Sequence, residues 1–141
     1  MKLTSVYFSA TFTTRRVVDY VSRRLSDQVT EYDITNDAST DEVLLAADEV
    51  LVVGIPVYAG RVPVMAVDRI RRFKGKGSRA VAIAVYGNRH YDDALLELSD
   101  ILSENGFQVI SAGAFLAQHS IFPKVGANRP DKEDFLQMDA F

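Results

Sequence analysis

The chain has 141 residues, of which 48% are hydrophobic and 25% are charged, and its formal net charge is −3. This composition is typical of a soluble globular protein, and the length fits one domain with one core. No apolar run approaches the roughly 20 residues that a membrane span needs, and the amino terminus lacks a signal-peptide pattern, so we expect a cytoplasmic protein without membrane partners. The acidic balance and the scattered basic residues argue against nucleic acid as a partner.

The chain contains no cysteine. This excludes disulfides, thiolate nucleophiles and cysteine-bound iron–sulfur clusters within the chain. Any redox chemistry must therefore be carried by a bound organic cofactor.

The amino-terminal stretch combines a predicted strand with a loop rich in hydroxyl groups. An apolar run from Lys2 to Phe8 predicts the strand, and apolar residues at helical spacing begin at Val17. The loop between them carries four hydroxyl side chains, Ser9, Thr11, Thr13 and Thr14. These hydroxyls and the unbonded N–H groups of the first helical turn can converge on one point, where the helix dipole favours an anion such as a phosphate.

Two arginines, Arg15 and Arg16, bear on this predicted anion site. They fall in the first helical turn, where a positive charge is unfavourable unless an anion lies nearby. The alternative is that Thr13 or Thr14 only caps the helix and that both arginines face water. The loop by itself leaves both interpretations open.

The middle of the chain alternates strands with helices. Gln28 to Ile34 predicts a strand, and Thr40 or Asp41 can cap a brief helix that runs to Ala47. Glu49 to Ile55 is apolar without alternation, which is typical of a strand that is buried on both faces of a parallel sheet.

The remaining chain continues this alternation. Pro63 opens a predicted helix from Val64 to Arg72, and Lys74 to Gly77 predicts a solvated turn before a second buried strand, Ser78 to Val85. A helix from Tyr91 stops at Gly106, a natural C-cap. The last predicted elements are a strand from Phe107 to Phe115 and a short helix that begins at Asp131.

Five strands that alternate with helices predict an α/β fold, a three-layer α/β/α sandwich around a five-stranded parallel sheet. Ligands of such folds bind at the carboxyl ends of the strands. Three loops should meet there: Ser9 to Thr14, Pro56 to Val62 and Tyr86 to Tyr91.

The second and third loops carry aromatic rings and glycines. Tyr58, Tyr86 and Tyr91 can stack on a planar ligand, and the glycines let backbone groups reach its polar edge. A single tyrosine at a loop end is more often a packing residue. Because three loops converge with a phosphate site, we expect a planar ligand with a phosphate tail.

The three loops resemble those of flavodoxins. The matching segments are Tyr7 to Thr14, Pro56 to Pro63 and Tyr86 to Leu95, and His119 to Asp131 also follows the pattern. The chain is most similar to the flavodoxin domain that many anaerobic bacteria and archaea fuse to a ferredoxin domain. The resemblance implies one flavodoxin-like domain over residues 1–141, a strand order of 2-1-3-4-5, and non-covalently bound FMN that shuttles electrons.

The resemblance also implies a role for each position of the loops. The phosphate would be held by Ser9, Ala10, Thr11, Phe12, Thr13 and Thr14. One side of the flavin ring would be lined by Pro56, Val57, Tyr58, Ala59 and Gly60, and the other by Tyr86, Gly87, Asn88, Arg89 and Tyr91. Tyr58 and Tyr91 are the expected ring contacts, and the carbonyl of Ala59 or Gly60 would accept a hydrogen bond from the reduced flavin N5.

The implied role is that of an electron carrier or of the flavin domain of an oxidoreductase. The implied partner is a redox protein such as a ferredoxin or another iron–sulfur protein, and a homodimer is compatible with the sequence. The chain lacks the ferredoxin half and its last helix is short, so it is either an excised domain or passes electrons to a separate protein.

A second hypothesis is that the chain is a flavodoxin-fold module that has lost FMN and serves as a protein-binding or assembly domain. Phe12 favours it, because flavodoxins usually have glycine there and a side chain can block the close approach of the backbone to a phosphate. The aromatic second and third loops favour FMN.

Overall fold

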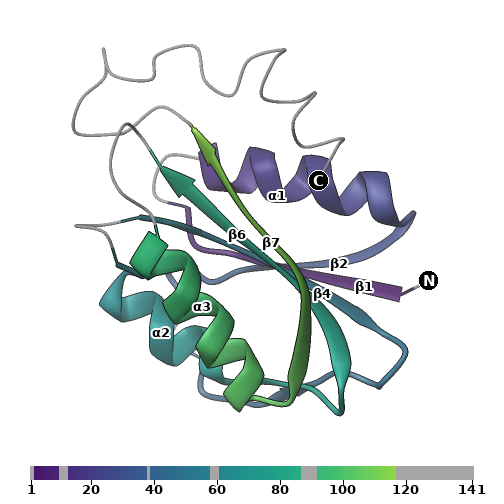
Figure 1. The fold of residues 1–141 in the computed structure, drawn as a ribbon. Helices are drawn as coiled ribbons and strands as arrows, with labels where there is room; N and C mark the ends of the chain where they lie inside the picture. Colours follow the sequence, from purple (N-terminus) through teal and green to yellow (C-terminus); the bar gives the residue numbers. More distant parts are fainter. Residues whose placement is uncertain (1, 10–12, 38, 58–60, 87–91, 117–141) are drawn as a thin grey trace.

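The computed structural model describes residues 2–9, 13–37, 39–57, 61–86 and 92–116. Its main sheet has five parallel strands in the order β2-β1-β4-β6-β7 (Figure 1). Their bounds are β1 (Lys2–Tyr7), β2 (Gln28–Asp33), β4 (Val50–Pro56), β6 (Ser78–Tyr86) and β7 (Phe107–Leu116). When only these five strands are numbered along the chain, the order is 2-1-3-4-5, which confirms the predicted sheet.

Helices cover both faces of this sheet, as predicted for a three-layer sandwich (Figure 1). One face carries α1 (Thr13–Leu25), and the other carries α2 (Val64–Arg71) and α3 (Asp92–Glu104). The central strand β4 belongs to both cores. Val52 packs in the cluster that includes Val18 of α1, whereas Val53 packs in the cluster that includes Leu98 of α3. Burial on both faces explains why this strand is apolar without alternation.

The predicted helix that ends at Ala47 is wrong. This segment contains a short strand, β3 (Val43–Leu44), which pairs in parallel with β5 (Phe73–Lys74) in a second, two-stranded sheet. The Leu45 N–H donates to the Lys74 carbonyl (2.8 Å), and the Leu45 side chain is buried. The extended backbone places Leu45 in the core and gives its N–H a partner, so tertiary contacts override the local helix signal.

The segment from Lys74 to Gly77 is also less solvated than expected. It begins inside β5, and the Gly75 N–H donates to the Asn105 carbonyl at the end of α3 (2.9 Å). Gly106, the predicted C-cap, has φ of 90°, which confirms the expectation, since this backbone conformation favours glycine. A Cβ at Gly106 would lie 2.3 Å from the Gly75 carbonyl oxygen, so the two turns pack backbone against backbone.

The helix expected from Asp131 lies outside the described residues. None of the helices in the described part of the chain is long and apolar enough to cross a membrane.

Candidate functional site

The three loops singled out in the sequence begin side by side at the carboxyl edge of the sheet. β1 pairs with β4, and β4 pairs with β6. This pairing continues past the strand ends, because the Phe8 N–H donates to the Gly54 carbonyl (3.2 Å) and the Val57 N–H donates to the Val85 carbonyl (3.1 Å). The geometry expected for ligand binding in an open α/β sheet is therefore present at this edge.

Ser9 organises the start of the first loop. Its N–H donates to Thr35 Oγ1 (2.8 Å), and its own Oγ accepts the N–H of Arg15 in the first turn of α1 (3.3 Å). The Ser9 hydroxyl thus satisfies one of the N–H groups that a helix start leaves without an intrahelical partner. The helix begins at Thr13, so Arg15 lies in its first turn, as the sequence predicts, and Thr13 and Thr14 both lie within the helix.

Close packing between α1 and β4 holds the amino terminus of this helix over the sheet edge. A Cβ at Gly54 would lie 2.1 Å from Val18 Cγ2 and 3.2 Å from Thr14 Cγ2. Thr14 is buried and presents its methyl group to β4. Thr14 therefore serves as a packing residue, in addition to supplying an N–H in the first turn.

The charge of Arg15 is offset within the protein. Arg15 Nη2 lies 3.3 Å from Glu31 Oε1 on β2, and the Tyr7 hydroxyl donates to the same oxygen (2.6 Å). The guanidinium also lies over the Tyr7 ring, 5.7 Å from its centre. Glu31 therefore supplies a negative charge that offsets Arg15, so this arginine gives no separate support for a bound anion.

This cluster also shifts two pKa values. Burial, followed by the hydrogen bond to Glu31, raises the pKa of Tyr7. Burial and the negative charge of Glu31 raise the pKa of Asp19, which lies on α1 four residues after Arg15. The first turn of α1 contains no acidic residue, so no carboxylate of that turn opposes an anion at the helix start.

The second loop is anchored at both ends. Val57 is buried in the core, so its side chain supports the loop from below, and Pro56 is half-buried at the end of β4. At the far end, the Val62 N–H (3.0 Å) and Arg61 Nε (3.1 Å) both donate to Glu97 Oε1. Burial raises the pKa of Glu97, but these two partners outweigh it and lower the pKa overall. Since Glu97 lies on α3, the helix that follows the third loop also holds the second loop.

The third loop begins at Tyr86, which is half-buried and packs against the core cluster of the α2 and α3 face. The structure therefore brings together Ser9, Thr13, Thr14, Pro56, Val57 and Tyr86, of the residues predicted to bind the cofactor. The other predicted residues lie outside the described part of the chain: Ala10, Thr11, Phe12, Tyr58, Ala59, Gly60, Gly87, Asn88, Arg89 and Tyr91.

Two residues near the first loop were missed by the sequence analysis, Thr35 and Arg69. Thr35 accepts the Ser9 N–H, and Arg69 Nη1 on α2 donates to the carbonyls of Ile34 (2.9 Å) and Thr35. Thr35 directly follows the strand that the sequence predicts to end at Ile34, but no local pattern identifies Ser9 as its partner. No sequence signal identifies Arg69, because its contacts depend on how α2 packs beside the end of β2.

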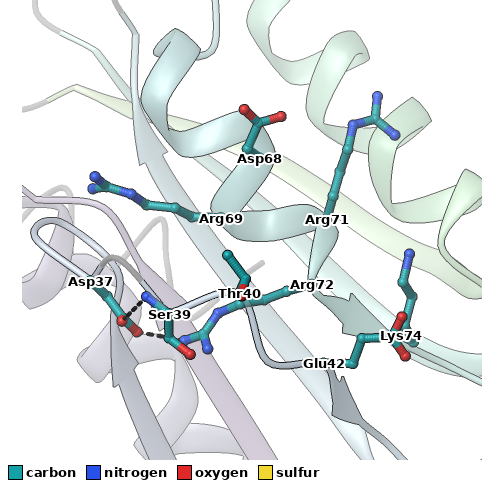
Figure 2. Close-up of a pocket in the computed structure, with 9 residues that line it drawn as sticks. All are labelled: Asp37, Ser39, Thr40, Glu42, Asp68, Arg69, Arg71, Arg72 and Lys74. Carbon is teal, nitrogen blue, oxygen red and sulfur yellow. Dashed lines mark hydrogen bonds and ion pairs between the residues drawn. The ribbon is translucent and has the colours of Figure 1, made fainter.

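A charged pocket of about 400 Å³ lies beside the carboxyl-terminal half of α2 (Figure 2). Its main charges have structural partners: Arg72 pairs with Asp37, Arg69 binds backbone carbonyls, and Arg71 pairs with Glu104. Its lining residues are Asp37, Ser39, Thr40, Glu42, Asp68, Arg69, Arg71, Arg72 and Lys74. The lining residues carry both signs of charge. The contacts of Arg69 and Arg72 join the connection between β2 and β3 to the end of α2.

Comparisons with known proteins identify the fold. The chain matches no protein-family model and no curated protein sequence. Solved structures do match it: an NADH:FMN oxidoreductase in its apo form aligns with a TM-score of 0.67 and 14% identity over 99% of this chain and 84% of that chain. An archaeal flavodoxin aligns with a TM-score of 0.61 and 12% identity, over 99% of this chain and 92% of that chain.

A flavodoxin of Fusobacterium nucleatum, solved with flavin mononucleotide bound, is also similar. It aligns with a TM-score of 0.58 and 16% identity over 78% of this chain and 70% of that chain. The chain therefore has the flavodoxin-like fold.

Proposed function

We propose that this chain binds FMN non-covalently at the carboxyl edge of its sheet and transfers electrons. The observation that carries the proposal is that β1, β4 and β6 end side by side, so that the three loops that follow them begin at one edge of the sheet. The likeness in fold to flavodoxins, one of them solved with flavin mononucleotide, supports it.

The described residues fit a phosphate at the start of α1. The first turn offers backbone N–H groups, of which that of Arg15 already donates to Ser9 Oγ; the turn has no acidic residue, and it includes the hydroxyl-bearing Thr13. Hydroxyls, backbone N–H groups and a helix dipole are the donors that bind phosphate in proteins. In this proposal Ser9 to Thr14 hold the phosphate, Pro56 to Gly60 lie along one side of the ring, and Tyr86 to Tyr91 lie along the other.

When bound, FMN would supply the redox chemistry, and the protein would position it and set its surroundings. The loops would keep water from both faces of the ring, and the anchor of Val62 to Glu97 would hold the second loop in place. The proposal extends to a ferredoxin or another iron–sulfur protein as the redox partner, and to kinship with flavodoxin domains that are fused to ferredoxins.

Titration of the purified protein with FMN and with riboflavin tests the proposal. We expect flavin absorption and quenched flavin fluorescence on binding, with Ser9→Ala lowering the affinity for FMN roughly fivefold because one hydroxyl is lost. Riboflavin has no phosphate, so its affinity should change little. Ser103→Ala, an exposed serine on α3, is the matched control.

A protein that binds neither flavin would refute the proposal and favour the second candidate, a module that has lost FMN and binds other proteins. Phe12 is the observation behind that candidate, since flavodoxins usually have glycine at this position. If Phe12→Gly then creates FMN binding, the side chain of Phe12 is what closed the site.

A further inference from the structure

We propose that Arg69 of α2 is a positioning residue for the first loop, acting through Thr35 and Ser9, and that it sets the preference of the site for FMN over riboflavin. The inference rests on the proposed function for its ligand. The positioning itself is carried by three consecutive contacts in the described part of the chain.

The first contact is between Arg69 and the turn that follows β2. Arg69 Nη1 donates to the Ile34 carbonyl (2.9 Å) and to the Thr35 carbonyl. Hydrogen bonds from a charged donor are shorter and stronger than neutral ones. One guanidinium that binds two consecutive carbonyls restrains the peptide between them.

The second contact passes through Thr35. Its N–H donates to Asp33 Oδ1 (3.0 Å), and its Oγ1 accepts the Ser9 N–H (2.8 Å). The Thr35 backbone is thus held from both sides, by Asp33 and by Arg69. Because the backbone is held, its hydroxyl stays in place to receive Ser9.

The third contact joins Ser9 to α1. Ser9 Oγ accepts the Arg15 N–H (3.3 Å), so the hydrogen bonds run without a break from α2 to the first turn of α1. Ser9 and this turn are both among the proposed phosphate donors. Loosening Arg69 should therefore disturb the phosphate end of the ligand more than the ring end.

The neighbouring arginines supply controls. Figure 2 shows Arg69 of α2 and Arg72, the residue after α2, extending toward the connection after β2, while Arg71 points away from it. Arg72 binds further along this connection, at Asp37 and at the Asp41 carbonyl (3.4 Å). Arg71 instead pairs with Glu104 on α3 (2.9 Å), so Arg71→Met removes the same charge from the same helix without touching the three contacts.

The test compares Arg69→Met, Arg69→Lys and Arg71→Met in the full chain. FMN and riboflavin are titrated into each variant, and amide hydrogen exchange is measured without ligand. We expect Arg69→Met to lower FMN affinity roughly tenfold, and to speed exchange of the Ser9 and Arg15 amides about fivefold or more. Riboflavin affinity should stay within about twofold, Arg69→Lys should recover part of the loss, and Arg71→Met should match the parent.

Thr35→Val tests the same path without altering the helix. It removes the hydroxyl that receives Ser9 and keeps both carbonyls that Arg69 binds. If Arg69 acts through Thr35, the double variant Arg69→Met/Thr35→Val should lose little more FMN affinity than either single variant. Additive losses would overturn the path.

Other outcomes also decide the matter. Unchanged exchange at Ser9 and Arg15 in Arg69→Met would overturn the positioning role. Equal losses of affinity for FMN and for riboflavin would overturn the role of Arg69 in this preference and would mean that it only stabilises the fold. If the parent binds neither flavin but Arg69→Met still speeds exchange at these amides, the proposed function fails while the positioning role stands.

Discussion

Replacement of Gly54 by alanine is the sharpest test of how α1 is placed over the sheet. An added Cβ would lie 2.1 Å from Val18 Cγ2 and 3.2 Å from Thr14 Cγ2. Non-bonded carbon atoms prefer separations of about 3.5–4.0 Å. Val18 is fully buried and branched at Cβ, and a valine in a helix strongly prefers one χ1 rotamer, so rotation of its side chain is costly and we expect α1 to move away from β4.

The cost follows from the size of this displacement. Overpacking a core by one methyl group typically costs about 1–3 kcal/mol. Because the contact with Val18 would have to open by well over 1 Å, we expect Gly54→Ala to lower the free energy of unfolding by about 3 kcal/mol. A shift of α1 also displaces the Thr13 and Thr14 amides, so the proposed FMN affinity should fall as well.

Urea unfolding of four proteins measures this cost: the parent, Gly54→Ala, Val18→Ala and the double variant. Val18→Ala removes the Cγ2 methyl group that the new Cβ would meet at 2.1 Å, so Gly54→Ala should cost at least about 1.5 kcal/mol less in that background. Gly77→Ala is the control, because a Cβ there meets nothing within 4 Å and only its φ of +77° opposes the change. A cost below about 0.5 kcal/mol for Gly54→Ala, or no relief from Val18→Ala, would refute the argument.

Two further predictions concern stability. Gly106→Ala combines a positive φ of 90° with a Cβ that would lie 2.3 Å from the Gly75 carbonyl oxygen, so thermal unfolding should show a loss of about 3 kcal/mol or more, well above that of Gly77→Ala. For Tyr7, burial and the hydrogen bond to Glu31 raise the pKa in the folded state, so above about pH 10 the unfolded chain loses this proton first and stability falls as pH rises. Tyr7→Phe should reduce that alkaline loss in urea unfolding at successive pH values, and an unchanged alkaline slope would contradict the pKa shift.

The sheet could be predicted because burial on two faces leaves a local record. The run from Val50 to Ile55 is apolar at every position, and the structure places it at the centre of the sheet with residues in both cores. Likewise, α3 ends in a turn where Gly106 has a positive φ. Glycine adopts this conformation most readily, so its presence in the sequence predicts the end of the helix. These features depend on residues that are neighbours along the chain.

The segment around Leu45 shows where such prediction ends. Its acidic start and apolar spacing favour a helix. The structure has an extended backbone there instead, because the Leu45 N–H donates to the Lys74 carbonyl and the Leu45 side chain is buried in the core. Local propensities differ by only about 1 kcal/mol per residue, so one buried side chain and its backbone hydrogen bonds can reverse them.

The candidate site divides in the same way. The sequence by itself determined which strands end in hydroxyl-bearing and aromatic loops, because strand periodicity and loop composition are local properties. Only the tertiary structure decided that Glu31 neutralises Arg15 and that Arg69 reaches Thr35. These pairs come from different elements, and their contacts depend on strand register and on how each helix lies across the sheet, which no local pattern encodes.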